Sequence, residues 1–290
     1  MFGRHGIRLL DRFLDSPFSG LAPWVWMAML AGPGRFEVAV SGALAVSLLI
    51  LAMCWQRGIP VHVIEFLGVS YFVMLAIVGL HASSATKAWL ELWSGDITSA
   101  LLAGYAAVTL LLRRPYTMVY ARHTVPRERW GTSLFVRVHL VITGVWAGAF
   151  AFAAISGFIG DAVVHDTDNF WTGWVLQLAA LLFAVAFNDF YPDYARARAH
   201  GHAPVPSWVR VVEWMPPFLL GTAVAGWTLG AVTAAGCVAL SLGGLASGAL
   251  MRRPVVLRGA ATTRPAKDQR PEQEIVDRQS EEWVRATGAG

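Results

Sequence analysis

Acidic side chains inside apolar segments are the residues of this chain whose types can do chemistry. Glu65 lies about one helical turn into an apolar run, where an ionisable group is a functional candidate because lipid disfavours its charge. Its depth also lets it reach the membrane interface and pair with His62 or Arg57. We favour this anchoring role over a proton or substrate role.

A second acidic pair, Asp189 and Asp193, has the spacing that places two side chains on one helical face. Such a pair can hold Mg²⁺ and a diphosphate head group, as in membrane-embedded transferases. No second acidic motif completes that site, and Pro192 is expected to break the helix between the acids. We therefore favour a charged helix end, paired with Arg137 across the bundle.

Histidine placement does not indicate a cofactor or metal site. Arg137 and His139 begin one apolar run, and His139 and His165 fall on opposite sides of the membrane in the topology argued below. The sequence shows no phosphate-cradling glycine loop and no Ser-His-Asp arrangement. We predict no catalytic residue, no cofactor and no metal, and a non-enzymatic protein is expected before an enzyme.

Composition places these residues in a membrane. Of 290 residues, 56% are hydrophobic and 14% are charged, and the mean hydropathy is +0.50, whereas soluble domains carry about a quarter charged residues. The pI near 9.4 reflects arginines in the gaps between apolar runs, which is a topology signal rather than a nucleic-acid-binding stripe. Cys54 and Cys237 both lie in expected spans, so no disulfide framework is indicated.

The apolar runs predict an all-α, polytopic bundle of about eight transmembrane helices, with a range of six to eight. The first six are expected at 21–30, 38–55, 61–80, 97–112, 134–159 and 170–190. The glycine-rich run 217–251 is preferably a hairpin of two short spans breaking near Gly230, with one long tilted helix as the alternative. Residues 87–93 are expected to form a separate interfacial helix.

Four segments follow from these boundaries. They are a basic amphipathic interfacial segment (1–19), a six-span membrane module (20–198), a cytoplasmic loop plus glycine-rich hairpin (199–253) and a disordered charged tail (254–290). A signal peptide is the less favoured interpretation of the first segment, because Asp11 and Asp15 interrupt its charged region.

Loop charge predicts the orientation. The connection 113–137 carries six arginines against Glu128, whereas the next connection carries Asp161, Asp166 and Asp168 and no Lys or Arg. Arginines recur after the sixth span and at Arg252 and Arg253. Alternation of basic and non-basic loops places both termini in the cytoplasm.

Three small-xxx-small pairs indicate close helix packing, either within the monomer or at a homo-oligomer or partner interface. They are Gly144 and Gly148, Gly226 and Gly230, and Gly244 and Gly248. Packing within the monomer is the favoured interpretation.

Residues 21–198 resemble the intracellular septation protein A family of bacterial inner membranes. The similarity lies in GLAPWVWMAML followed by FEVAVSGALAVSLLILAMCWQRG, in LLLRRPYTMVYARHTVPRERW, in HLVITGVWAGAFAF and in DTDNFWTGWVLQLAALLFAVAF. The third span lacks a close match, and the family ends at its equivalent of Arg198.

The resemblance implies a non-enzymatic scaffold or interaction protein of the cell envelope, multi-pass in the bacterial plasma membrane. It implies division or envelope-synthesis membrane proteins as partners, beside the anionic lipids that the basic loops favour. The candidate docking loop then comprises Arg113, Arg114, Pro115, Tyr116 and Trp130. A small transporter or channel is the alternative, and a transferase using Asp189 and Asp193 is third.

The orientation is tested by reporter fusions. Alkaline phosphatase fused after Gly290 is expected to be inactive, because the enzyme folds only outside the cytoplasm, and the same reporter after Asp166 is expected to be active. Periplasmic activity of the fusion at Gly290 would refute two cytoplasmic termini.

Overall fold

The computed structural model describes residues 14, 16–166, 169–201 and 204–252. Contacts divide the chain into two units between Gly248 and Ala249, and the packing given below is that of the first. The predicted charged tail and most of the predicted N-terminal amphipathic segment lie outside the described residues. The division into four segments therefore stays a prediction.

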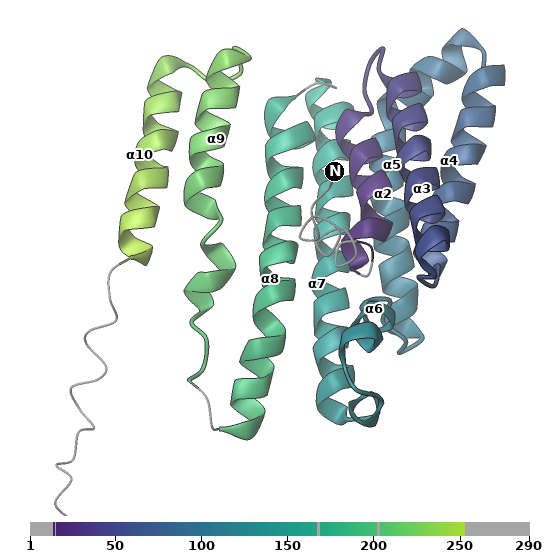
Figure 1. Cartoon of the computed structure of the whole chain (residues 1–290). Coiled ribbons are helices and arrows are strands. Elements are labelled where there is room, and N and C mark those ends of the chain that lie inside the picture. Colours follow the sequence, from purple (N-terminus) through teal and green to yellow (C-terminus); the bar gives the residue numbers. More distant parts are fainter. Residues whose placement is uncertain (1–13, 15, 167–168, 202–203, 253–290) are drawn as a thin grey trace, which may run out of the picture. The chain divides into compact units, whose positions relative to one another are not determined.

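Every regular element in the described part is a helix (Figure 1). The main helices are α2 (Pro17–Leu30), α3 (Phe36–Arg57), α4 (Val63–His81), α5 (Ser84–Leu111), α6 (Thr117–Thr124), α7 (Ser133–Phe158), α8 (Leu176–His200), α9 (Met215–Thr228) and α10 (Ala234–Met251). Short helical segments accompany them: η1 (Arg127–Arg129), the π-helical η2 (Ile159–Val164) and η3 (Phe170–Val175), and η4 (Trp208–Val212).

Six described helices are long and apolar enough to cross a bilayer, so the chain is a polytopic membrane protein. They are Phe36–Arg57, Val63–His81, Ser84–Leu111, Ser133–Val164, Phe170–Ala199 and Ala234–Met251. Helices α2 and α9 have 14 residues each, about 21 Å at the α-helical rise, which is shorter than a hydrocarbon core of about 30 Å. All eight predicted segments are helical, and two of them are short.

Helix α2 lies inside the bundle although it is short. It packs against α3, α4 and α5, and Leu21, Trp24 and Met27 are almost completely buried. A short helix is tolerated at membrane depth where protein surrounds its ends, because the unpaired backbone groups then avoid lipid. The packing around α2 therefore explains why this segment does not need full spanning length.

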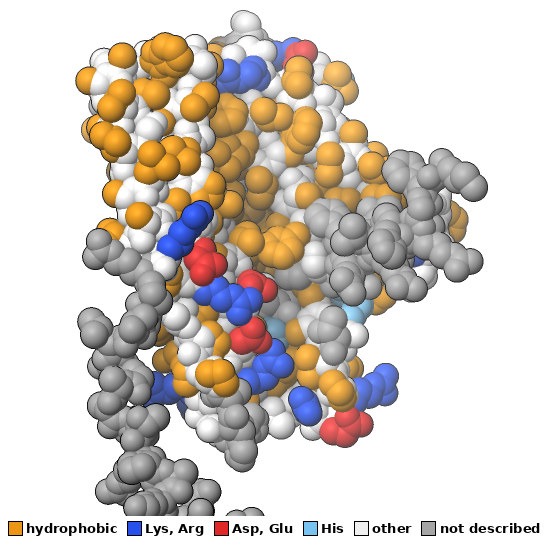
Figure 2. All heavy atoms as spheres, turned by 60° about the vertical axis from the view of Figure 1, so that its left-hand side comes forward, with side chains coloured by type: hydrophobic (Ala, Val, Ile, Leu, Met, Phe, Trp, Pro, Cys, Tyr) orange, Lys and Arg blue, Asp and Glu red, His pale blue; other side chains and the backbone are white. Residues whose placement is uncertain are grey.

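The run 217–251 forms two helices, as in the preferred hairpin interpretation. Gly230 has a φ of +72°, a left-handed conformation that glycine adopts without steric cost. The Val232 N–H donates to the Gly226 carbonyl at 2.9 Å across the turn. Along α10 the apolar side chains of Leu242 and Leu245 are exposed. Figure 2 shows hydrophobic side chains over the upper part of the molecular face in view. Lipid contact accounts for such a surface.

Two predictions about local structure are wrong. Residues 87–93 do not form a separate interfacial helix, because α5 begins at Ser84 and continues through them to Leu111. The Ser83 hydroxyl accepts the Thr86 N–H at 3.2 Å and caps this long helix. Pro192 does not break α8, which runs on to His200; a proline removes only one backbone donor, and packed membrane helices tolerate that loss.

Trp146 is the largest fully buried side chain of the core. It lies on α7, which packs against both α5 and α8, and its ring contacts those of Phe18 and Phe150 at centroid distances of 6.0 and 5.4 Å. Aromatic contacts of this kind stabilise helix packing by dispersion. The side chain thus joins α2 to the centre of the bundle.

Trp146→Ala is expected to lower the free energy of unfolding by about 3 kcal/mol, because Phe18 and Phe150 lose their contacts and a cavity is left between the helices. Equilibrium unfolding in mixed detergent micelles measures the change. Trp89→Ala is the matched control, since Trp89 is 52% exposed on α5. Equal losses in the two variants would contradict the assigned core.

Candidate functional site

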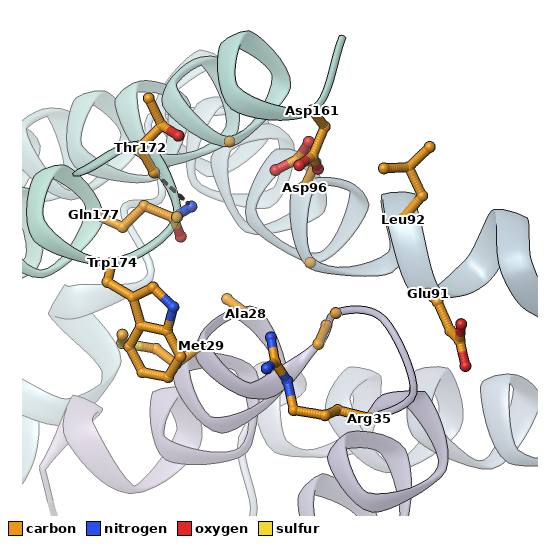
Figure 3. Close-up of a pocket in the computed structure, with 15 residues that line it drawn as sticks. Ala28, Met29, Arg35, Glu91, Leu92, Asp96, Asp161, Thr172, Trp174 and Gln177 are labelled. Atoms are coloured by element: carbon orange, nitrogen blue, oxygen red, sulfur yellow. Dashed lines mark hydrogen bonds between the residues drawn. The ribbon is translucent and has the colours of Figure 1, made fainter. Parts of the chain in front are cut away.

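A polar cavity of about 30 Å³ lies among α2, α5, the end of α7 and the beginning of α8. Its polar lining comes from Arg35, Glu91, Asp96, Asp161, Thr172 and Gln177. Figure 3 shows Asp96 and Asp161 side by side on one wall, with Arg35 and Trp174 on the opposite side. A cavity of this size has room for about one water molecule or ion.

Asp96 and Asp161 bring two carboxyl groups together from different helices. Asp96 belongs to α5, and Asp161 belongs to the π-helical continuation of α7. The Oδ2 atom of Asp96 is buried and has no hydrogen-bond partner among the described residues. Adjacent carboxyl groups inside a bundle can hold a proton or a cation, because two neighbouring negative charges repel each other.

Glycine makes this approach possible. A Cβ atom built at Gly157 on α7 would lie 2.9 Å from Cγ of Asp96, which is closer than two carbon atoms pack. Helix α5 can therefore carry Asp96 up to α7 only because residue 157 has no side chain.

Side chains satisfy the backbone where the helices become π-helical. The Thr172 carbonyl accepts hydrogen bonds from Ser156 Oγ at 3.0 Å and from Gln177 Nε2 at 3.2 Å. Asn169 Oδ1 accepts the N–H groups of Trp171 and Thr172. π-Helical turns are frequent at functional sites, and here they shape the wall that faces Asp96.

Sequence reasoning missed Asp96 as a site residue. The predicted fourth span begins at residue 97, so Asp96 fell outside it, whereas α5 places it well inside a long helix. The available signal was the continuous helical pattern of residues 84–111, which carries one aspartate. Asp161 was predicted only as part of a non-basic loop.

Glu65 is buried at the beginning of α4, with 7% of its surface exposed. Its Oε2 accepts the backbone N–H of His62 at 2.5 Å, and its Oε1 accepts the Tyr120 hydroxyl at 3.3 Å. The first bond caps the helix, since Glu65 at the third helical position satisfies the free backbone N–H of His62, the residue just before the helix. The second bond ties α4 to α6.

Asp189 and Asp193 share one partner from a later part of the chain. Arg210 donates through Nη2 to Asp189 Oδ2 at 2.7 Å and through Nη1 to Asp193 Oδ2 at 3.2 Å, and Arg196 donates to Asp193 Oδ1 at 2.6 Å. The neighbouring Asp189 carboxylate raises the pKa of Arg210. Among the described residues these two arginines, rather than Arg137, pair with the acids. A Mg²⁺ ion would have to displace Arg210.

His139 is buried on α7 and joins α6 to that helix. Thr117 Oγ1 lies 3.3 Å from His139 Nδ1 and 2.8 Å from Thr143 Oγ1. Arg137, two residues earlier, is exposed. The described residues contain no group of three His, Cys, Asp or Glu side chains that can hold a metal ion.

The candidate docking loop divides into an inner and an outer set. Pro115 and Tyr116 are buried, whereas Arg113 and Arg114 are exposed. Trp130 donates through Nε1 to the Val125 carbonyl at 2.8 Å. We call residues 113–130 the α6 platform, which lies at the lower end of the bundle in Figure 1.

The predicted glycine pairs lie in three different settings. Gly244 and Gly248 approach Pro216, with built Cβ atoms 3.0 Å from its carbonyl oxygen and 3.5 Å from its Cβ, respectively. Cβ atoms built at Gly144 and Gly148 meet no described atom within 4 Å. Gly226 lies on α9, but Gly230 lies in the turn after it, so that pair does not share a helix face.

Gly157→Ala is expected to lower the unfolding temperature by several degrees, because its Cβ displaces the Asp96 carboxyl. Thermal unfolding in detergent measures the loss, and Gly148→Ala on the same helix is the control with open space around it. Asp96→Ala added to Gly157→Ala should recover most of the stability, since the two changes act on one contact. Additive effects would rule out the contact.

Comparisons with family models, with curated proteins and with solved structures give no match to this chain.

Proposed function

We propose that this polytopic membrane protein is a non-enzymatic interaction protein of the bacterial cell envelope that docks partner proteins on the α6 platform. The observation that supports the proposal most directly is that the basic connection between α5 and α7 is folded. A loop that only sets topology needs positive charge and no tertiary structure.

The inner face of the platform holds it against the bundle. Tyr116 and Tyr120 are each 3% exposed, and Met118 is also buried. Hydrogen bonds between Thr117 and the α7 side chains His139 and Thr143 add polar links. A surface held in this way is pre-organised, which reduces the ordering cost of binding a partner.

The outer face of the platform presents cations around one aromatic ring. The guanidinium carbons of Arg122 and Arg127 lie 5.1 and 5.7 Å from the centroid of the Trp130 ring, within the range of cation–π attraction. Arg113 and Arg114, at the start of the same connection, are also exposed. Arginine and tryptophan are the residues most enriched at binding hot spots, and an acidic cytoplasmic segment of another membrane protein is complementary to this charge.

The resemblance of residues 21–198 to the intracellular septation protein A family supports division or envelope-synthesis proteins as the partners. It also supports the bacterial plasma membrane as the location, with the platform on the cytoplasmic side. Anionic lipid head groups at that surface add a second attraction for the same arginines.

A small transporter is the second candidate, and Asp96 and Asp161 favour it. Both acids lie in long apolar helices and face a polar cavity, which is the setting of proton and cation pathways in membranes. Proton or cation flux in liposomes that disappears in Asp96→Asn would favour this candidate over a docking protein.

The docking proposal is tested by crosslinking in native membranes followed by mass spectrometry. Wild-type protein is expected to capture division or envelope-synthesis proteins. The double variant Arg113→Glu and Arg114→Glu should lose at least about tenfold in captured partner, because reversed charges repel an acidic segment. Arg57→Glu, a charge reversal outside the platform, should capture normally. Unchanged capture by the double variant, or capture of the same chain alone, would contradict the proposal.

A further inference from the structure

A larger cavity lies behind the α6 platform. It has a volume of about 170 Å³ and lies where the beginning of α4 meets α5 and α6. Its walls are formed mainly by His62, Ile64, Tyr105, Tyr116 and Tyr120. An apolar cavity of about 150 Å³ holds benzene in another protein, so this space accommodates one six-membered ring.

Three tyrosines, Tyr105, Tyr116 and Tyr120, belong to the walls, so phenol groups lie beside the cavity. Tyr116 is 3% exposed, and its hydroxyl has no hydrogen-bond partner among the described residues. Burial raises the pKa of Tyr116 well above its ordinary value, so the phenol stays protonated and available as a donor. A buried hydroxyl without a partner costs free energy, and a ligand that accepts a hydrogen bond removes this cost.

The remaining polar groups exclude charged ligands. No Lys, Arg, Asp or Glu belongs to the described lining, in which His62 is the one ionisable side chain besides the tyrosines. An ammonium group would therefore be buried without a counter-ion, and a phosphate would meet no basic group but the imidazole of His62. Glu65 accepts the Tyr120 hydroxyl just behind the wall, and its acidic side chain further disfavours anions. The cavity therefore fits a neutral ring that carries hydrogen-bond acceptors.

The mouth of the cavity is apolar. Val61, Val63 and Val119 belong to the lining, and their exposed fractions are 42%, 65% and 39%. Val61 and Val63 lie at the beginning of the apolar helix α4, and Val119 lies on α6. A ligand can therefore place its ring among the tyrosines while an apolar tail stays in the bilayer.

We propose that this cavity binds the head group of a neutral, ring-bearing membrane lipid that accepts hydrogen bonds, the chemistry of a quinone. The Tyr116 hydroxyl donates to a ring carbonyl, and the tail leaves past the three valines. The site is one for binding, and it stands independently of partner docking on the outer face of α6.

Binding is tested on the purified full-length chain in detergent with a benzoquinone that carries a decyl chain as the probe. Isothermal titration measures the dissociation constant, and thermal unfolding measures ligand stabilisation. Wild-type protein is expected to bind with one site per chain. Tyr116→Phe keeps the ring but removes the donor, so its dissociation constant should rise about fivefold to tenfold without loss of stability of the free protein.

Val119→Trp fills the mouth from an exposed position and is expected to abolish binding, which keeps the proposal testable if Tyr116→Phe does not fold. Tyr194→Phe is the matched control and should bind as wild type does, because Tyr194 lies on α8 outside the cavity lining, with its ring against those of Phe190 and Trp208. The proposal is overturned if wild type does not bind, if Val119→Trp binds normally, or if a folded Tyr116→Phe binds with unchanged affinity. It is also overturned if decanol stabilises the protein as strongly as the quinone.

Discussion

The exclusion of water from the bilayer is the constraint on which the rest of this structure depends. Backbone and side-chain polar groups at membrane depth must find partners within the protein. The long helices meet this requirement internally, and the short helix α2 meets it by lying among α3, α4 and α5. Where α7 and α8 become π-helical, Ser156 and Gln177 bind the same carbonyl of Thr172. Local polar partners thus permit the irregular geometry that brings Asp161 next to Asp96.

Helix α6 contributes residues both to the wall of the larger cavity and to the exposed surface of the α6 platform. Tyr116, at its N-cap, and Tyr120 line the larger cavity, whereas Arg122 and Arg127 surround Trp130 on the outside. Any ligand that fills the cavity therefore contacts the helix that presents the platform. A change in the packing of α6 is the shortest physical route between the two surfaces, and Thr117 on α6 connects it to α7.

Hydrophobic length was sufficient to predict the membrane class, the helical segments and the hairpin at Gly230. Periodicity and composition are local properties, and membrane helices reflect them strongly because lipid surrounds most of each helix. The same reasoning failed at residues 87–93 and at Pro192. At residues 87–93 the helix is continuous because α5 begins at the Ser83 cap and runs through the semi-polar stretch. At Pro192 the helix is continuous because the packing of α8 outweighs the loss of one backbone donor.

The chemistry of single residues was less predictable, because it depends on partners far along the chain. Asp189 and Asp193 have the spacing of a metal-binding pair, yet Arg210, separated from them by a loop, contacts both carboxylates. Nothing near residue 190 in the sequence reveals that arginine. Asp96 presents the reverse case, because no other acid lies within four residues of it in the sequence, and it meets Asp161 only after α5 packs on Gly157. Spacing along one helix therefore identifies residues that can act together, whereas the packing between helices decides which of them do.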